Sequence, residues 1–234
     1  MFLAVTLTSA ILIKPRGQYK PSSKIIDIKL LKDPIALGIY FGGFFMQTGM
    51  FVVLMYFPSS LVDYTHISRD HATSLFMIYG AFAALGRVAS GFLAKRVDPV
   101  NATICGHFMC VVLLMTMWFS NKILGVYMVF LILFALSSSP YPALSPVIVA
   151  QNYPIEKIGQ VNAFTYLFSG ISTVIGLPVA GLIFQNLGKR VEYNQIMVMT
   201  AIFYLLSALC MIALKFGIKR KSKTETEVDL NFTV

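Results

Sequence analysis

Six long runs of apolar residues constrain the fold of this chain more than any other feature, because each holds at least 20 residues. A helix of about 20 apolar residues is long enough to cross the hydrocarbon core of a bilayer. Charged residues make up 12% of the chain and apolar ones 57%, a composition that excludes a soluble globular domain. The sequence therefore predicts an all-α, multi-pass integral membrane protein. The six transmembrane helices are predicted over Ile35–Phe57, Thr73–Phe92, Val100–Phe119, Ile123–Ala150, Val161–Phe184 and Ile196–Phe216.

The remaining segments divide the chain into four parts. Residues 1–13 are apolar but too short to cross a membrane, and they lack the basic start and the cleavage site of a signal peptide. We interpret them as the end of a truncated transmembrane helix, with an interfacial segment as the alternative. Residues 14–34 are basic and contain proline, glycine and serine, which favours a cytoplasmic linker. Residues 35–217 form the predicted six-helix domain, and residues 218–234 have the composition of a disordered cytoplasmic tail.

Positive charges are divided unequally between the two sides of the predicted membrane domain. Placing residues 14–34 inside puts fourteen of the 19 lysines and arginines on that side and four on the other. The positive-inside rule then places both termini in the cytoplasm. The formal net charge of +9 reflects this orientation and contact with anionic membrane lipids, and no nucleic-acid-binding motif accompanies it. The four cations on the other side are Arg69, Lys122, Lys189 and Arg190.

No grouping of residues in the sequence indicates a cofactor, a metal ion or the active site of an enzyme. Cys105, Cys110 and Cys210 fall within predicted helices at spacings that no metal cluster uses, so we interpret them as packing residues. No nucleophile, base and orienting group occur together at a plausible spacing. The predicted function is therefore not catalytic.

Two of the predicted helices repeat the same spacing of glycines, with intervals of six and then five residues. Each helix is the middle member of a group of three, and the charge distribution makes the two groups run in opposite directions. This pattern resembles the inverted three-plus-three repeat within each six-helix half of a major facilitator transporter. The alternative is that small residues recur because they let membrane helices pack closely. The glycines are Gly80, Gly86 and Gly91 in the first helix and Gly170, Gly176 and Gly181 in the second.

The predicted helix 123–150 contains three prolines in its cytoplasmic half, Pro140, Pro142 and Pro146. Prolines bend a helix and free backbone carbonyl groups, which lipid cannot satisfy. We therefore predict that this half-helix lines a cavity or a gate.

Arg87 lies inside the otherwise uncharged run 73–92. Because a guanidinium keeps its charge in lipid, this helix can cross the membrane only if Arg87 faces other helices, a watery cavity or an anion. We predict that Arg87 binds an anionic substrate; the alternative is an arginine that reaches the inner membrane surface or anchors a loop. The sequence places no Asp or Glu inside the six helices to pair with it.

Three further side chains are predicted to contact substrate. His107 and Arg87 lie at the same depth, roughly 10–12 Å from the cytoplasmic side, so consecutive antiparallel helices are expected to bring them together. His107 then shares the anion or carries a proton, or in the alternative it only bonds a neighbouring helix. Tyr141 and Phe168 are predicted to shape the pocket, or else to pack as ordinary aromatic residues.

Three segments resemble the monocarboxylate transporter family of the major facilitator superfamily, above all its yeast and other fungal members. The segment GRVASGFLAKRVDP (86–99) resembles the family's eighth helix and following loop. The segments PVIVAQNYPIEKIGQVNAF (146–164) and FSGISTVIGLPVAG (168–181) resemble its tenth and eleventh helices. The resemblance implies that the chain holds helices seven to twelve, so that its partner is a missing N-terminal half of six helices.

The resemblance also implies a role for Arg87, which matches the family arginine that pairs with the substrate carboxylate. In animal members that are proton symporters, an Asp stands four residues before this arginine. Here that position is Ala83, a departure that leaves proton coupling without its carboxylate. Fungal members act on other substrates as well, riboflavin among them.

Together these features predict the C-terminal half of a secondary transporter that moves a small organic anion by alternating access, in the plasma or vacuolar membrane. Arg87 binds the anion, and the repeated glycines permit close sliding contacts. Riboflavin or another small metabolite is the alternative substrate. Two rival interpretations are a truncated fragment that does not transport and a six-helix membrane scaffold that works as a homodimer.

Overall fold

A computed structural model describes residues 27–232 of the chain and the side chains of residues 27–221. This part of the chain is helical, with no strand among the described residues. Six of its helical segments are long and apolar enough to cross a membrane, which confirms the predicted all-α membrane fold. The elements are η1 (Ile28–Leu31), α2 (Pro34–Thr65), α3 (Arg69–Leu93), α4 (Pro99–Leu113) with the π-helical turns η2 (Leu114–Phe119), α5 (Leu124–Ser138), α6 (Pro140–Asn152), α7 (Ile155–Asn186) and α8 (Asn194–Phe232).

Aspartates fix the starts of two of these helices. The Asp33 carboxylate accepts a hydrogen bond from the backbone N–H of Ile35 at 3.0 Å, at the start of α2. Asp98 does the same at the start of α4. A proline follows each aspartate, and proline suits the first helical position because its missing N–H has no partner there. These local signals explain why the helices begin close to the predicted positions.

The fourth membrane segment is broken, as its prolines predict. Helix α5 ends at Ser138 and α6 begins at Pro140, with Ser139 at the joint. Pro140 cannot donate the hydrogen bond that would continue α5, so the helix axis changes at this point. Pro142 and Pro146 lie within α6.

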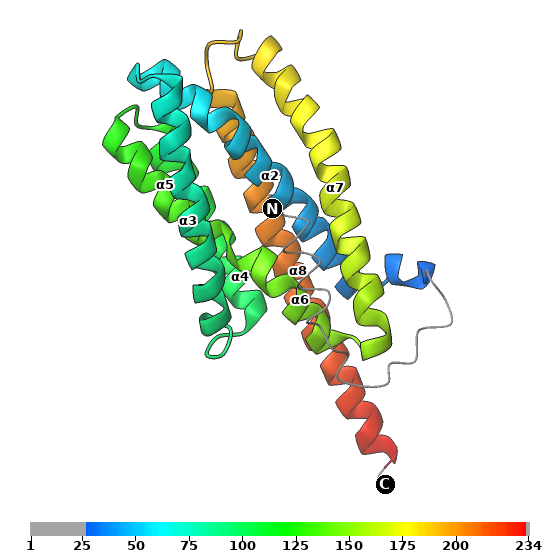
Figure 1. Ribbon diagram of the computed structural model, residues 1–234. Coiled ribbons are helices and arrows are strands. Elements are labelled where there is room, and N and C mark those ends of the chain that lie inside the picture. The colour runs from blue at the N-terminus through cyan, green and yellow to red at the C-terminus, as the bar shows by residue number, and fades with distance from the viewer. Residues whose placement is uncertain (1–26, 233–234) are drawn as a thin grey trace, which may run out of the picture.

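The helices pack in a pattern that repeats between the first three and the last three membrane segments. Helix α2 packs along α7 and α8, whereas α5 and α6 pack along α3 and α4. The first segment thus contacts the fifth and sixth, as the fourth contacts the second and third. Helices α3 and α7 run in opposite directions through the bundle, as Figure 1 shows. This arrangement matches the inverted three-helix repeat predicted from the glycine spacing.

Aromatic side chains fill the centre of the bundle. The rings of Phe57 and Phe130 stack with centroids 5.3 Å apart, and Trp118 packs against both. The Trp118 indole donates a hydrogen bond to the hydroxyl of Ser60 at 3.1 Å. A buried indole N–H needs such a partner, so this bond fixes where the π-helical turns meet α2.

Helices α3 and α7 are far less covered than the other membrane segments. Within their most apolar stretches, 11% and 17% of the residues are buried, against 39–50% in the other four segments. Figure 1 shows these two helices on opposite sides of the bundle, with α2 between them. We call the exposed side of α3 and α7 the open face; it is the part of the membrane domain that the rest of the described chain covers least.

The two ends of the chain differ in what the structure describes. The predicted truncated helix over 1–13 and most of the linker 14–34 lie outside the described residues. The segment 218–232, for which the composition predicts disorder, continues α8 as helix to Phe232. Adding residues to an existing helix avoids the cost of nucleation, which explains how a polar segment can extend it.

Candidate functional site

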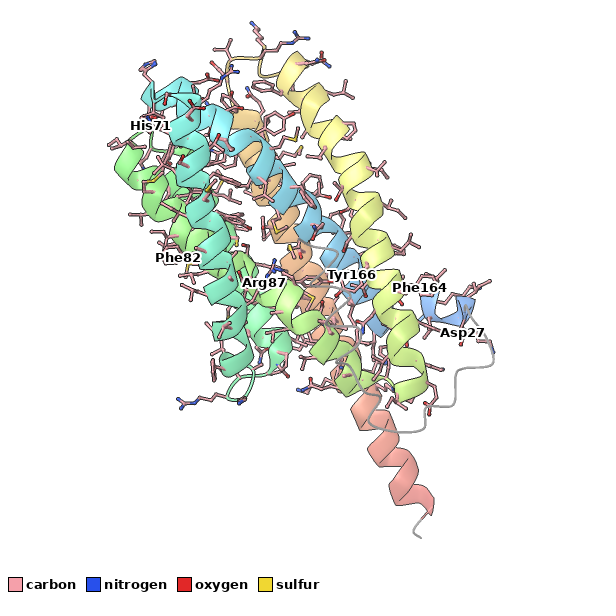
Figure 2. The ribbon with its side chains drawn as sticks, viewed as in Figure 1. Asp27, His71, Phe82, Arg87, Phe164 and Tyr166 are labelled. Atoms are coloured by element: carbon pink, nitrogen blue, oxygen red, sulfur yellow. The ribbon has the colours of Figure 1, made fainter. Side chains whose placement is uncertain are left out.

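Arg87 lies on the open face of α3. The side chain is exposed, and it belongs to a stripe of exposed residues at helical spacing formed by Gly80, Ala84, Arg87 and Gly91. A Cβ atom placed on Gly80 or Gly91 would meet no atom within 4 Å. Figure 2 shows Arg87 within the helical bundle, nearer to the end of α3 than to its start. The guanidinium is thus presented on a surface of small side chains.

The Arg87 guanidinium has no ion-pair partner within the part of the chain whose side chains are described. It lies 18 residues from the first residue of α3 and six from the last, inside the segment apolar enough to cross a membrane. A charge at that depth needs an anion, a polar cavity, another protein surface, or a side chain that reaches the membrane surface. A negatively charged group on the open face would therefore stabilise Arg87.

Gly86, next to Arg87 in sequence, faces the interior of the bundle. A Cβ atom on Gly86 would lie 2.8 Å from the side chain of Ser139, at the joint between α5 and α6. The Ser139 hydroxyl donates to the carbonyl of Ala83 at 3.0 Å. Glycine lets the two helices approach this closely, and the crossing fixes the rotation of α3 that puts Arg87 on the open face.

Gly176 makes a matching crossing on α7. A Cβ atom on Gly176 would collide with the methyl group of Thr48 on α2. The Thr48 hydroxyl donates to the carbonyl of Phe44 at 3.0 Å and lies 3.5 Å from that of Ser172. Of the other predicted packing glycines, Gly170 meets nothing within 4 Å, and Gly181 has only the Tyr56 hydroxyl at 3.6 Å. The glycine repeat therefore divides into buried crossings and open positions.

His107 lies inside the bundle and is fully buried. Its Nδ1 atom lies 3.1 Å from the hydroxyl of Ser207 on α8, and that hydroxyl also lies 2.7 Å from the Gly42 carbonyl. The Nε2 atom has no hydrogen-bond partner among the described residues. Because Arg87 is exposed and the ring contacts of His107 are to Tyr141 and Tyr204, the structure does not bring His107 and Arg87 together as the shared depth predicts.

Tyr141 is buried beside His107, with ring centroids 5.9 Å apart. Its hydroxyl donates to the carbonyl of Ile39 on α2 at 2.7 Å. The absence of a side chain at Gly43 leaves room for this hydroxyl. Tyr141 thus ties α6 to α2, and in this structure protein atoms cover both Tyr141 and His107.

Phe168 lies in the contact between α7 and α2. Its ring stacks on Tyr40 at 5.2 Å and meets the edge of Phe41 at 5.7 Å. Phe41 is 41% exposed, so this aromatic contact reaches the surface between α2 and α7. Tyr166, 64% exposed, lies on the other side of α7 from Phe168. Figure 2 places Tyr166 on the part of α7 that lies near α6. A planar ligand could stack on such a surface.

Gln47, which is not among the residues predicted from the sequence, lies near the middle of α2. Its side chain is half-buried, and its amide has no hydrogen-bond partner among the described residues. Gln47 lies one helical turn beyond Gly43, so it shares the α2 face that receives Tyr141. An uncharged amide inside an apolar run is the signal that would have identified it, because such a group seeks a polar contact in a membrane.

Two tyrosine–aspartate bonds hold α2 at both ends, a feature that the sequence does not reveal. The Tyr153 hydroxyl donates to the Asp33 carboxylate at 2.7 Å, and the Tyr193 hydroxyl donates to Asp63 at 2.6 Å. Burial raises the pKa of both tyrosines above the usual value of 10, and the adjacent carboxylate raises it further. Both hydroxyls therefore stay protonated donors at any physiological pH.

Comparison with known proteins relates this geometry to a family. The sequence profile of the Major Facilitator Superfamily matches residues 39–232. The chain is 26% identical to the transporter opdF of Penicillium oxalicum, over 92% of this chain and 49% of that protein. It is 23% identical to the riboflavin transporter MCH5 of Saccharomyces cerevisiae, over 80% of this chain and 36% of that protein. The chain thus spans half or less of the length of these relatives.

A solved structure shares the fold. The crystal structure of a bacterial homologue of the human lysosomal transporter Spinster, in an inward-facing and unoccupied conformation, matches with a TM-score of 0.64. The match covers 92% of this chain and 57% of the other, at 15% sequence identity. At that identity the likeness concerns the arrangement of helices alone.

Proposed function

The chain belongs to the Major Facilitator Superfamily, and on that premise we propose that it forms the C-terminal six-helix half of a transporter for a small organic anion. The observation that carries this proposal is Arg87, a permanent charge on the open face of a membrane-spanning helix, without an ion-pair partner among the described residues. A substrate carboxylate supplies the missing partner, and the planar guanidinium binds it through two hydrogen bonds.

A second six-helix bundle covers the open face in this proposal. Two observations support it: α3 and α7 are the least buried membrane segments, and Gly80 and Gly170 on them have open space where a side chain would stand. Small residues on a membrane helix allow another helix to approach closely. A second bundle also supplies polar contacts for Arg87 that the lipid hydrocarbon does not offer.

Transport proceeds by rocking of the two halves around the Arg87 site. The crossings at Gly86 and Gly176 lock α3 and α7 onto their own half, so the half moves as a unit. Sliding occurs instead along the open stripes of α3 and α7. Both termini lie in the cytoplasm, as the charge distribution predicts, and the protein resides in the plasma or vacuolar membrane.

Ala83 occupies the position one helical turn before Arg87, where a carboxylate would neutralise the guanidinium. With alanine there, the anion itself balances the charge of Arg87. The empty transporter carries an unpaired charge in the membrane, which raises its free energy. Binding of the anion removes this free-energy cost and so favours the loaded transporter.

Riboflavin is the second candidate substrate. Similarity to a yeast riboflavin transporter supports it, together with the aromatic contact of Phe41 and Phe168, which reaches the surface through the exposed Phe41. A planar ring system stacks on aromatic side chains without needing a carboxylate. This candidate assigns substrate contact to α2 and α7 rather than to Arg87.

An uptake panel distinguishes the two candidates. Cells that express the protein are compared with empty-vector cells for uptake of labelled monocarboxylates, of the matching uncharged amides and of riboflavin. We expect saturable uptake of one or more carboxylates and none of their amides. Equal uptake of acid and amide, or uptake of riboflavin alone, would remove the anion from the proposal.

A further inference from the structure

A cavity of about 400 Å³ lies at the end of the bundle where α2 ends and α3 and α8 begin. Its polar lining comes from Ser59 and Asp63 on α2, Arg69 and Thr73 on α3, and Tyr193 just before α8. Figure 1 shows this end opposite the C-terminal extension of α8. The volume falls in the range of sites that hold small molecules, roughly 300–1,000 Å³.

The polar groups of the cavity differ in whether they already have a hydrogen-bond partner. The Asp63 carboxylate accepts a hydrogen bond from the Tyr193 hydroxyl at 2.6 Å, which fixes its position. Arg69 also lines the cavity, and within the described residues its guanidinium forms no ion pair with Asp63 or with any other carboxylate. The Ser59 hydroxyl is exposed and has no hydrogen-bond partner in the same part of the chain. Arg69 and Ser59 are thus hydrogen-bond donors without a side-chain partner in the described chain, in the same cavity as the Asp63 acceptor.

Arg69 and Arg87 lie on one face of α3. They are 18 residues apart, which is five full helical turns or about 27 Å. Thr73, Gly80 and Ala84 lie between them on the same face, and all three are exposed. The stripe that presents Arg87 therefore extends toward the cavity, and its small members alternate with Phe76, whose ring stacks on Tyr79.

We propose that this cavity is a second, outlying binding site for a small organic carboxylate that also carries a hydroxyl or amino group. Arg69 and Ser59 bind the carboxylate, and the hydroxyl or amino group donates to Asp63. The proposal rests on the proposed function, in which the same class of anion binds at Arg87. It adds the requirement for a donor group on the substrate, because an anion without one would leave Asp63 facing it unpaired.

The test measures protection of an introduced thiol. Thr73→Cys is placed in the full chain with the three native cysteines replaced by serine or alanine, and labelling by uncharged N-ethylmaleimide is timed. Three matched probes are added: glycolate has a carboxylate and a hydroxyl, acetate lacks the hydroxyl, and ethylene glycol lacks the carboxylate. We expect glycolate to slow labelling at about one-tenth of the acetate concentration, the ratio that one hydrogen bond to a charged group supplies. Ethylene glycol should have no effect.

Variants identify the groups responsible. Arg69→Gln should abolish protection by glycolate, whereas Arg190→Gln, which removes a cation outside the cavity lining, should leave it unchanged. Val62→Cys, at a lining residue that makes no bond in the proposal, provides a second labelling position if Thr73→Cys does not fold. Absence of protection at both positions, or a thiol that never reacts because another segment fills the cavity, would overturn the proposal.

Arg87→Gln separates this proposal from the one on which it rests. Protection at Thr73→Cys should survive Arg87→Gln, because the two sites are about 27 Å apart. Loss of uptake in Arg87→Gln with normal protection supports both sites. Normal uptake in Arg87→Gln together with Arg69-dependent protection would overturn the transport role of Arg87 and leave the outlying site standing.

Discussion

Gly86 of α3 and Gly176 of α7 occupy equivalent positions in the two inverted three-helix groups. Each glycine contacts a hydroxyl-bearing side chain of a neighbouring helix. Ser139 fills this place for Gly86, and Thr48 fills it for Gly176. Each hydroxyl bonds a carbonyl four residues earlier in its own helix and approaches a carbonyl of the glycine-bearing helix. The two inverted groups therefore share the contact between glycine and hydroxyl as well as the spacing of the glycines.

The first prediction concerns these crossings. Gly86→Ala and Gly176→Ala should each destabilise the chain by about 1–3 kcal/mol, because the added Cβ overpacks a contact that cannot relax. Gly80→Ala and Gly170→Ala are matched controls, since a Cβ there meets nothing within 4 Å. Thermal unfolding of the purified chain in detergent measures the difference. Thr48→Ala should rescue Gly176→Ala, and a failure of that rescue would show that the crossing is not the cause.

The second prediction concerns the open stripes. Gly80→Leu and Gly170→Leu should leave the thermal stability of the chain unchanged, because a Cβ atom at either position meets no atom within 4 Å and both positions are exposed. They should nevertheless block transport, since a large side chain there keeps a second bundle away from α3 and α7. Uptake and melting temperature are measured on the same variants. Normal uptake by both variants would argue that no helix packs on this face.

The third prediction assigns His107 a structural role. Ser207→Ala should destabilise the protein by about 1–3 kcal/mol, because Nδ1 of the fully buried His107 loses its partner. Uptake per folded molecule should keep its KM, since protein covers the ring on all sides. A changed KM with unchanged stability would instead place His107 in contact with substrate.

The fourth prediction concerns orientation in the membrane. In a background without native cysteines, Lys221→Cys should resist an impermeant thiol reagent in intact cells, and Lys189→Cys should react. The reason is the excess of lysine and arginine on the side that carries Lys221. Permeabilised cells serve as the control, in which both positions must react. Labelling of Lys221→Cys in intact cells would invert the assigned topology.

Most of the fold could be predicted from the sequence, because run length and proline act locally. Six apolar runs set the number of helices, and Pro140 sets the break before α6. The partners of individual side chains could not be predicted in the same way. Residue counting places His107 and Arg87 at one depth, but the rotation of each helix about its axis turns His107 inward and Arg87 outward.

The glycine repeat shows the same division. Its spacing indicates the inverted groups, yet spacing alone does not tell which glycine meets a neighbour. Gly86 and Gly176 face Ser139 and Thr48, which the sequence places far away, whereas Gly80 and Gly170 face open space. The cavity at Arg69 also depends on contacts between distant segments, here α2, α3 and the residue before α8.

The most direct measurement of the central claim is uptake by Arg87→Lys, normalised to the amount of protein at the membrane. Lysine keeps the positive charge but cannot reproduce the paired hydrogen bonds of a guanidinium to a carboxylate. We expect uptake at low substrate concentration to fall by about a hundredfold, the equivalent of about 3 kcal/mol. Arg96→Lys, in the loop after α3, should transport normally. Normal uptake per membrane-localised molecule in both Arg87→Lys and Arg87→Ala would contradict the claim that Arg87 binds the transported anion.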